Sequence, residues 1–173
     1  MTGSVADFTA RANGALIVLT VGSAPASDSS PGGPSGCLVG FWSQCSIHPE
    51  AFAVWVSKAN HTATVAEVGA PVVMHLVPRG KADLARWFGE TSGDDTDTFA
   101  GTRWEAGPDD VPVLTSLRDR VLGRIGQVVD LGDRADHVCV VVEPLLVELE
   151  DDPDDPVLLR LDEAADFSAA HPA

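Results

Sequence analysis

Four side chains that can bind a phosphate lie close together in the chain, namely Ser57, Lys58, Asn60 and Thr62. Asn60 is typical of a helix N-cap and predicts a helix over His61 to Val68. Backbone N–H groups in the first turn of a helix have no partner within it, and beside a lysine and hydroxyl groups they attract an anion. We therefore predict a phosphate site at this junction. The alternative is a capped helix with a lysine on its surface.

The segment around this junction is a predicted strand, turn and strand. Apolar residues predict a first strand from Cys37 to Ile47, a turn at His48-Pro49 and a second strand from Ala51 to Ser57. The helix that follows should end at Gly69, because glycine readily adopts the left-handed conformation found after helices. The predicted phosphate site thus depends on how this unit folds.

Further apolar runs of strand length occur along the chain. These predicted strands are Ala15 to Val21, Pro71 to Val77, Arg120 to Leu131 and His137 to Leu149. The polar turn from Gly132 to Asp136 joins the last two strands, so we expect an antiparallel hairpin.

Only short helices are expected between and around these strands. They are Val5 to Asn13, Lys81 to Phe88 with its end at Gly89, and Asp162 to Phe167. A doubly wound parallel sheet needs regular crossover helices, which this chain lacks. The sequence therefore favours a mainly β fold, a closed or half-closed antiparallel β-barrel with short helices.

Length and composition indicate one domain. The chain has 173 residues, of which 45% are hydrophobic, enough for one full core and too few for two comfortable ones. We expect the single domain to span residues 1–173, with its core over about residues 10–150 and an acidic turn and short terminal helix over 151–173. The segment Gly22 to Ser35, rich in Ser, Pro and Gly, is expected to be a loop.

The charge of the chain limits its partners. A net charge of −15 and a pI near 4.4 argue against nucleic acid and anionic membranes, since both would be repelled. The apolar run Ala15 to Val21 is too short to span a membrane. An anionic cofactor would need local positive charge, which again draws attention to Lys58.

The three cysteines, Cys37, Cys45 and Cys139, predict neither a disulfide framework nor a metal site, because their spacing matches neither. Cys37 and Cys45 are an even number of residues apart, so in one regular strand they would share a face. A reduced, cytoplasmic protein is the simpler interpretation, and we expect no bound metal.

Several of these segments occur in the order found in a known family. They are Gly36 with the strand through Ser43 and Ser46, Pro49, Ser57 to Thr62, Leu84-Ala85 with Phe88-Gly89, Asp97 with Phe99-Ala100, Val128 to Asp130 with Gly132-Asp133, and His137 to Glu143. In this order the sequence resembles the flavin reductase-like family, which has the FMN-binding split β-barrel fold. The resemblance rests on the order of the segments along the chain rather than on one motif.

The resemblance implies an obligate homodimer that holds FMN, or FAD, at the subunit interface and transfers hydride from NADH or NADPH to the flavin. Reduced flavin from such proteins commonly feeds a separate flavin-dependent oxygenase. The positions that match the family's flavin contacts are Leu38, Val39, Gly40, Phe41, Ser43, Ser57, Lys58, Asn60 and Thr62. His137 matches a histidine near the nicotinamide and is the candidate catalytic residue.

Two departures from the family bear on this site. Many members have a polar Thr-Ala-Ser-Ser run where this chain has Leu38 to Phe41, so only backbone amides could bind flavin there. The extra loop Asp133 to Asp136 lengthens the approach to His137 and could alter access for the nicotinamide.

Two other functions compete with a reductase. The chain could hold FMN, a deazaflavin or haem in the same barrel without using a nicotinamide, or it could be a dimeric scaffold that has lost its cofactor. The apolar run Leu38 to Phe41 favours the scaffold. In either case His137 would be an ordinary surface or hydrogen-bonded histidine.

Overall fold

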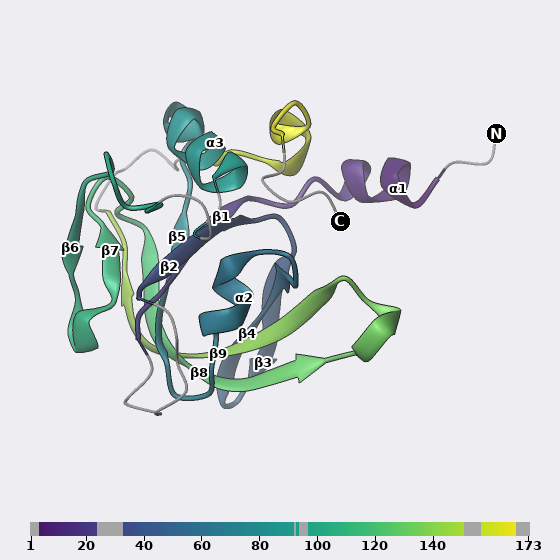
Figure 1. The fold of residues 1–173 in the computed structure, drawn as a ribbon. Coiled ribbons are helices and arrows are strands. Elements are labelled where there is room, and N and C mark those ends of the chain that lie inside the picture. Colours follow the sequence, from purple (N-terminus) through teal and green to yellow (C-terminus); the bar gives the residue numbers. More distant parts are fainter. Residues whose placement is uncertain (1–3, 24–32, 92, 94–96, 151–156, 169–173) are drawn as a thin grey trace.

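The computed structural model describes residues 4–23, 33–91, 93, 97–150 and 157–168, and at its centre is a seven-stranded antiparallel sheet (Figure 1). The order of the strands is β2-β1-β5-β8-β9-β4-β3. Their bounds are β1 (Ile17–Val21), β2 (Ser35–Val39), β3 (Trp42–Ile47), β4 (Glu50–Ser57), β5 (Pro71–Leu76), β8 (Arg120–Asp130) and β9 (His137–Glu148). The predicted mainly antiparallel β fold is confirmed. Most of the predicted loop before β2 and of the acidic turn after β9 lies outside the described residues.

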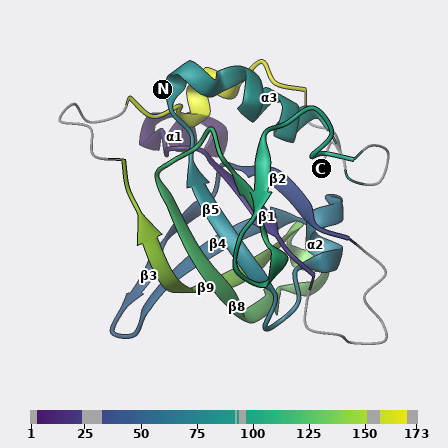
Figure 2. The same cartoon turned by 90° about the vertical axis from the view of Figure 1, so that its left-hand side faces the viewer.

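The sheet curls because its two outermost strands are neighbours in the chain. Only Gly40 and Phe41 separate β2 at one edge from β3 at the other. So short a link cannot cross a flat sheet of this width, so the two edges must approach each other. The indole N–H of Trp42 donates to the carbonyl oxygen of Ala15 at 2.7 Å and ties β3 to the segment that enters β1. Figure 2 shows the strands curving around a shared interior.

The predicted single strand from Cys37 to Ile47 is wrong, because the structure divides it into β2 and β3. The chain changes there from pairing with β1 to pairing with β4. Cys37 is consequently buried and Cys45 exposed, so the prediction that they share a face is also wrong. The turn at His48-Pro49 joins β3 to β4 as predicted.

The longest hairpin of the sheet is formed by β8 and β9, as predicted. Its register runs from Arg120 opposite Glu148 to Asp130 opposite Val138. The short 3-10 helix η3 (Gly132–Arg134) closes the hairpin. This closed end projects from the barrel at the right of Figure 1.

Helix α1 (Val5–Ala12) lies outside the sheet, whereas α2 (His61–Val65) lies between β2 and β9 in Figure 1. Helix α2 ends earlier than the predicted Val68. The N–H of Gly69 donates to the carbonyl of Ile125 at 2.7 Å, and the N–H of Ile125 donates to that of Ala70 at 3.0 Å. Pairing with β8 therefore takes this segment out of the helix.

Helix α3 (Ala82–Glu90) continues through Gly89, where the sequence predicted its end. A Cβ atom at Gly89 would lie 3.1 Å from Leu38, so the absence of a side chain there lets β2 approach the helix closely. The predicted terminal helix from Asp162 to Phe167 is also wrong in type and length, because the structure has a short 3-10 helix, η4 (Leu161–Ala164).

A small second sheet pairs β6 (Trp104–Ala106) with β7 (Pro112–Leu114). The 3-10 helices η1 (Arg79–Lys81) and η2 (Pro108–Asp110) precede α3 and β7. His75 of β5 connects this second sheet to the main sheet, since its Nε2 accepts a hydrogen bond from the backbone N–H of Leu114 at 3.1 Å.

The core lies on both faces of β1. Ile17, Leu19 and Val21 belong to the barrel interior, whereas Val18 packs with Phe88 of α3 on the outside. This burial on both faces explains why β1 reads as a continuous apolar run. None of the described helices has the length and apolarity needed to cross a membrane.

Candidate functional site

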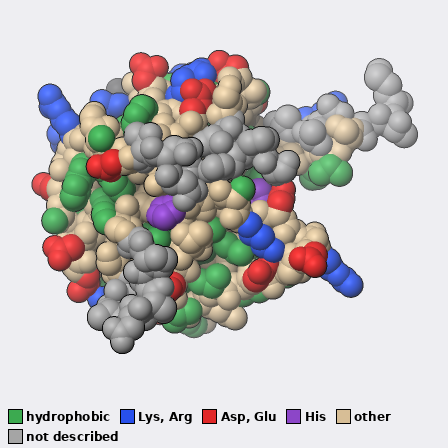
Figure 3. Space-filling view, viewed as in Figure 1, with side chains coloured by type: hydrophobic (Ala, Val, Ile, Leu, Met, Phe, Trp, Pro, Cys, Tyr) green, Lys and Arg blue, Asp and Glu red, His purple; other side chains and the backbone are tan. Residues whose placement is uncertain are grey.

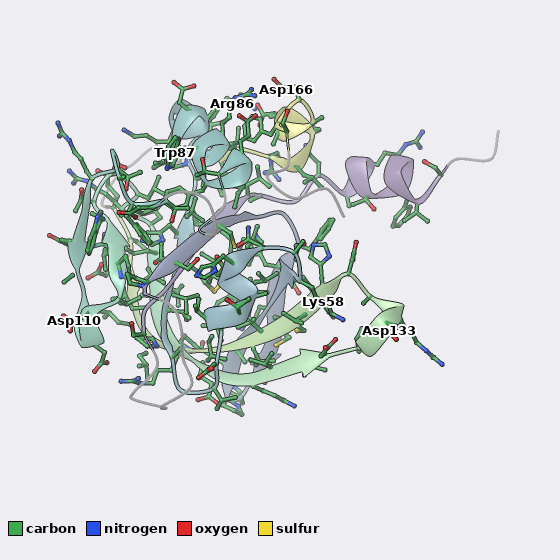
Figure 4. All side chains as sticks on the ribbon, viewed as in Figure 1. Lys58, Arg86, Trp87, Asp110, Asp133 and Asp166 are labelled. Carbon is green, nitrogen blue, oxygen red and sulfur yellow. The ribbon has the colours of Figure 1, made fainter. Side chains whose placement is uncertain are left out.

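Lys58 follows β4 and is in contact with the closed end of the β8–β9 hairpin. Its Nζ lies 2.6 Å from Oδ1 of Asp130 and donates to the carbonyl oxygen of Gly132 at 2.7 Å. Its backbone N–H donates to the carbonyl oxygen of Asp136 at 2.8 Å. Figure 4 shows Lys58 beside the end of the hairpin and Asp133 at its tip. The lysine predicted to bind phosphate is therefore already bound to two acceptors of the protein.

His137 begins β9 directly opposite Ser57, the last residue of β4. Its Nδ1 lies 2.7 Å from Oδ1 of Asp136, and its ring meets the ring of Phe41 edge to face, with centroids 5.8 Å apart. Phe41 is 46% exposed, so one part of its ring remains available to a ligand. The structure thus brings four of the predicted residues to one place, namely Phe41, Ser57, Lys58 and His137.

We call Lys58, Asp130, Asp136 and His137 the polar corner. Hydrogen bonds from Lys58 and His137 lower the pKa values of Asp130 and Asp136 respectively, so both carboxyl groups are ionised at neutral pH. An ionised carboxylate can only accept, so Nδ1 of His137 must bear the hydrogen. Figure 3 shows acidic and basic side chains next to one another over this end of the hairpin.

The run that departs from the family is largely packed against protein. Leu38 packs against the apolar cluster that includes Phe88 of α3, and Val39 is buried in the barrel interior. A Cβ atom at Gly40 would lie 2.9 Å from the side chain of Leu161 in η4. A ligand at this run would therefore meet backbone amides, to which the sequence limited the contacts, and also the ring of Phe41.

The remaining predicted side chains make contacts of their own outside the polar corner. Ser43 is exposed on β3, opposite Ala53 of β4. Asn60 caps α2 as predicted, since its Oδ1 accepts from the N–H of Thr62 at 2.9 Å. The hydroxyl of Thr62 is buried 2.9 Å from that of Ser35, so it is directed to the interior.

A pocket of about 400 Å³ lies beside the start of α2. Its lining includes His61, three residues after Lys58, and the segment Asp97 to Phe99. Trp104 forms an aromatic wall with Phe99, their ring centroids being 5.6 Å apart. The size is in the range of small-molecule sites.

The sequence did not identify Asp130, Asp136 or His61 as site residues. The acidic residues flank the hairpin turn and His61 follows an N-cap, but nothing local shows which side chains they meet. Among the described residues, no group of three or more His, Cys, Asp and Glu side chains could hold a metal.

Comparisons with known proteins agree with this architecture. The family model described as flavin reductase like domain matches residues 11–166. The structure of the FMN-binding protein from Thermus thermophilus with bound p-hydroxybenzaldehyde has a TM-score of 0.69 at 21% identity, over 87% of this chain and 80% of that chain. NADH:FAD oxidoreductase SgcE6 from Streptomyces globisporus C-1027 has a TM-score of 0.62 at 20% identity, over 78% and 74%.

A third solved structure, of a protein from Sinorhizobium meliloti 1021, has a TM-score of 0.67 at 16% identity. It matches 87% of this chain, which spans 49% of that longer protein. A search of curated proteins found no match. At these identities the structural matches show the fold, whereas the family model spans most of the chain. The protein therefore belongs to the flavin reductase like domain family.

Proposed function

We propose that the protein is an NAD(P)H-dependent flavin reductase that uses FMN, or FAD, and takes hydride from NADH or NADPH. In a chain of this family, the observation that carries the proposal is the polar corner, where Asp136 orients the imidazole of His137 beside the half-exposed ring of Phe41. When bound, the flavin supplies the redox chemistry, and the protein supplies binding and orientation.

The described residues fit the ring of a flavin. A flat conjugated ring needs apolar or aromatic surfaces, and both the exposed part of Phe41 and the wall formed by Phe99 and Trp104 provide them. His137 lies against Phe41, so a nicotinamide stacked near that ring would be within reach of its Nε2. The role of His137 in this proposal is to hold the carboxamide or a phosphate of the dinucleotide by hydrogen bonding, with no proton given to the flavin.

Fewer groups of the protein are available to bind the phosphate of FMN than to contact its ring. The ammonium of Lys58 has three N–H donors, of which Asp130 and Gly132 occupy two, so one remains for a phosphate. Backbone amides of Leu38 to Phe41 and the side chains of Ser43, Ser57, Asn60 and Thr62 complete the proposed contacts. Among these side chains Thr62 would have to give up its bond to Ser35.

We further propose a homodimer. The outer half of β9 bears large apolar side chains that are at least 49% exposed. They are Leu145, Leu146 and Val147, and Leu149 follows directly after β9. Several exposed apolar side chains at one end of a hairpin are typical of interfaces. Light scattering should give a dimer at micromolar concentration, and a monomer would count against this part of the proposal.

The proposed setting is the reducing cytoplasm, with reduced flavin passing to a separate oxygenase. What supports this setting is that Cys37, Cys45 and Cys139 are all free thiols, as is usual for proteins of a reducing compartment.

The purified protein provides the test. Titration of FMN with the protein should quench the flavin fluorescence until binding saturates, which gives the dissociation constant. Added NADH or NADPH should then bleach the yellow colour under anaerobic conditions. FMN that binds but is not reduced would instead support the second candidate, a non-catalytic protein that binds a flavin, deazaflavin or haem. Failure to bind any of these cofactors would contradict both and support the third candidate, a dimeric scaffold that has lost its cofactor. The engagement of Lys58 by Asp130 and the packing of Leu38 and Val39 against the protein favour that third candidate.

A further inference from the structure

Lys58 touches both ends of the connection between β8 and β9. Its ammonium bonds Asp130 at the end of β8 and the carbonyl of Gly132 in the turn, while its backbone N–H bonds the carbonyl of Asp136 just before β9. The side chain of Lys58 is 31% exposed and that of Asp130 58% exposed, so their ion pair lies at the surface and is screened by salt. Lys58, directly after β4, therefore holds the connection at three points.

The connection has little internal bonding of its own. The carbonyl of Gly132 also accepts from the N–H of Ala135 at 3.3 Å, near the upper limit for a hydrogen bond. The N–H of Gly132 donates to Oδ1 of Asp130 at 2.8 Å, the same carboxylate oxygen that Lys58 contacts. Removing the ammonium would thus loosen the turn on both sides.

The position of His137 depends on this turn. Asp136 is the last residue of the connection, and its carboxylate holds Nδ1 of the imidazole. Among the described residues, Asp136 alone hydrogen-bonds this imidazole. With Nδ1 fixed and one side of the ring against Phe41, Nε2 is the nitrogen left for a ligand.

We propose that Lys58, acting with Asp130, is a positioning residue for His137: it holds the β8–β9 connection so that Asp136 fixes the imidazole and Nε2 is presented to the nicotinamide dinucleotide. This inference rests on the proposed reductase function, and it replaces the phosphate contact proposed above for Lys58 with a role in holding the hairpin.

Enzyme kinetics and flavin titrations separate the two roles of Lys58. Lys58→Met should lower kcat/KM for NADH or NADPH about 3-fold to 10-fold, mainly through KM, because it disturbs the position of a binding group. The ratio of the FMN and riboflavin dissociation constants should change by less than about twofold, since a positioning residue does not bind the phosphate. Lys58→Arg should keep most of the activity. Arg86→Met removes a cation of α3 that pairs with Glu90 and Asp166, away from Lys58 in Figure 4, and as the matched control it should behave as the parent.

A double-mutant cycle tests whether Lys58 acts through Asp130. The variant Lys58→Met with Asp130→Asn should be no worse than the poorer single variant, because both substitutions break one interaction. Losses that multiply would overturn the proposal. Loss of FMN affinity with riboflavin affinity intact would also overturn it and identify Lys58 as a phosphate ligand.

The tautomer of His137 gives a readout that does not depend on activity. Nitrogen NMR of the parent should show hydrogen on Nδ1, and Lys58→Met should shift His137 toward the other tautomer while Arg86→Met does not. An unchanged tautomer in Lys58→Met would overturn the proposed positioning role of Lys58. If the parent protein reduces no flavin but the tautomer shifts as expected, the proposed function fails and the coupling of Lys58 to His137 through the hairpin connection stands.

Discussion

His75 and His137 occupy opposite environments in the same sheet. His75 is fully buried; its Nδ1 lies 3.1 Å from the carbonyl of Val18, and its Nε2 accepts from the N–H of Leu114. Desolvation lowers its pKa to about 3, and the nearby charge of Arg120 adds to this, whereas the bond to Val18 opposes it. The side chain of His137 is 25% exposed and bonded at Nδ1 by Asp136.

The difference shows what makes a histidine available for chemistry. Both nitrogens of His75 are used to join β1, β5 and β7, so its imidazole stays neutral and contributes to the fold. His137 is anchored through one nitrogen and lies at the end of two strands, where its second nitrogen can meet a ligand. A search for perturbed pKa values alone would select His75 as the functional histidine, whereas the geometry selects His137.

The largest effect that follows from this comparison is acid destabilisation through His75. Its pKa is about 3 in the folded protein and about 6.5 when unfolded, so between these values the unfolded chain binds more protons. The contribution of His75 to stability is therefore fully present above pH 6.5 and falls as the pH drops toward 3, by up to about 1.4 kcal/mol per pH unit and on the order of 5 kcal/mol in total. Urea unfolding at several pH values measures this loss.

A variant separates His75 from other acid-sensitive groups. His75→Gln removes the titration but keeps a polar side chain, so the loss of stability between pH 6.5 and pH 4 should become shallower. An equally steep loss in this variant would show that other groups cause it.

The next largest effect is the loss of the hydrogen bonds of His75. His75→Leu leaves the carbonyl of Val18 and the N–H of Leu114 buried without these partners, which should destabilise the fold by about 2 to 4 kcal/mol at neutral pH. His137→Leu, at a partly exposed position, should cost less than about 1 kcal/mol. Equal losses measured by urea unfolding would break the distinction between the two residues.

Features set by neighbouring residues could be predicted from the sequence. The alternation of β8 and β9 around a polar turn predicted their hairpin, and Asn60 predicted the N-cap of α2. The order of the family's motifs also predicted the fold, because that order involves segments along most of the chain.

Features set by distant residues could not be predicted in this way. The break between β2 and β3 follows from pairing with two different strands, β1 and β4, which an apolar run does not show. Likewise nothing near Lys58 in the sequence indicates that Asp130 binds its ammonium, and the apolar run of β5 does not reveal the partners of His75. Long-range pairing thus decided which candidate residues form a site.

The most direct test of the central claim, that His137 serves the nicotinamide, is anaerobic reduction of FMN by NADH or NADPH in the parent and in His137→Ala. The variant should bind FMN with an almost unchanged dissociation constant and show kcat/KM for the nicotinamide lowered about 10-fold to 100-fold, equivalent to roughly 1.4 to 2.8 kcal/mol. A variant that loses FMN, or that reduces it as well as the parent does, would contradict this placement of the nicotinamide site.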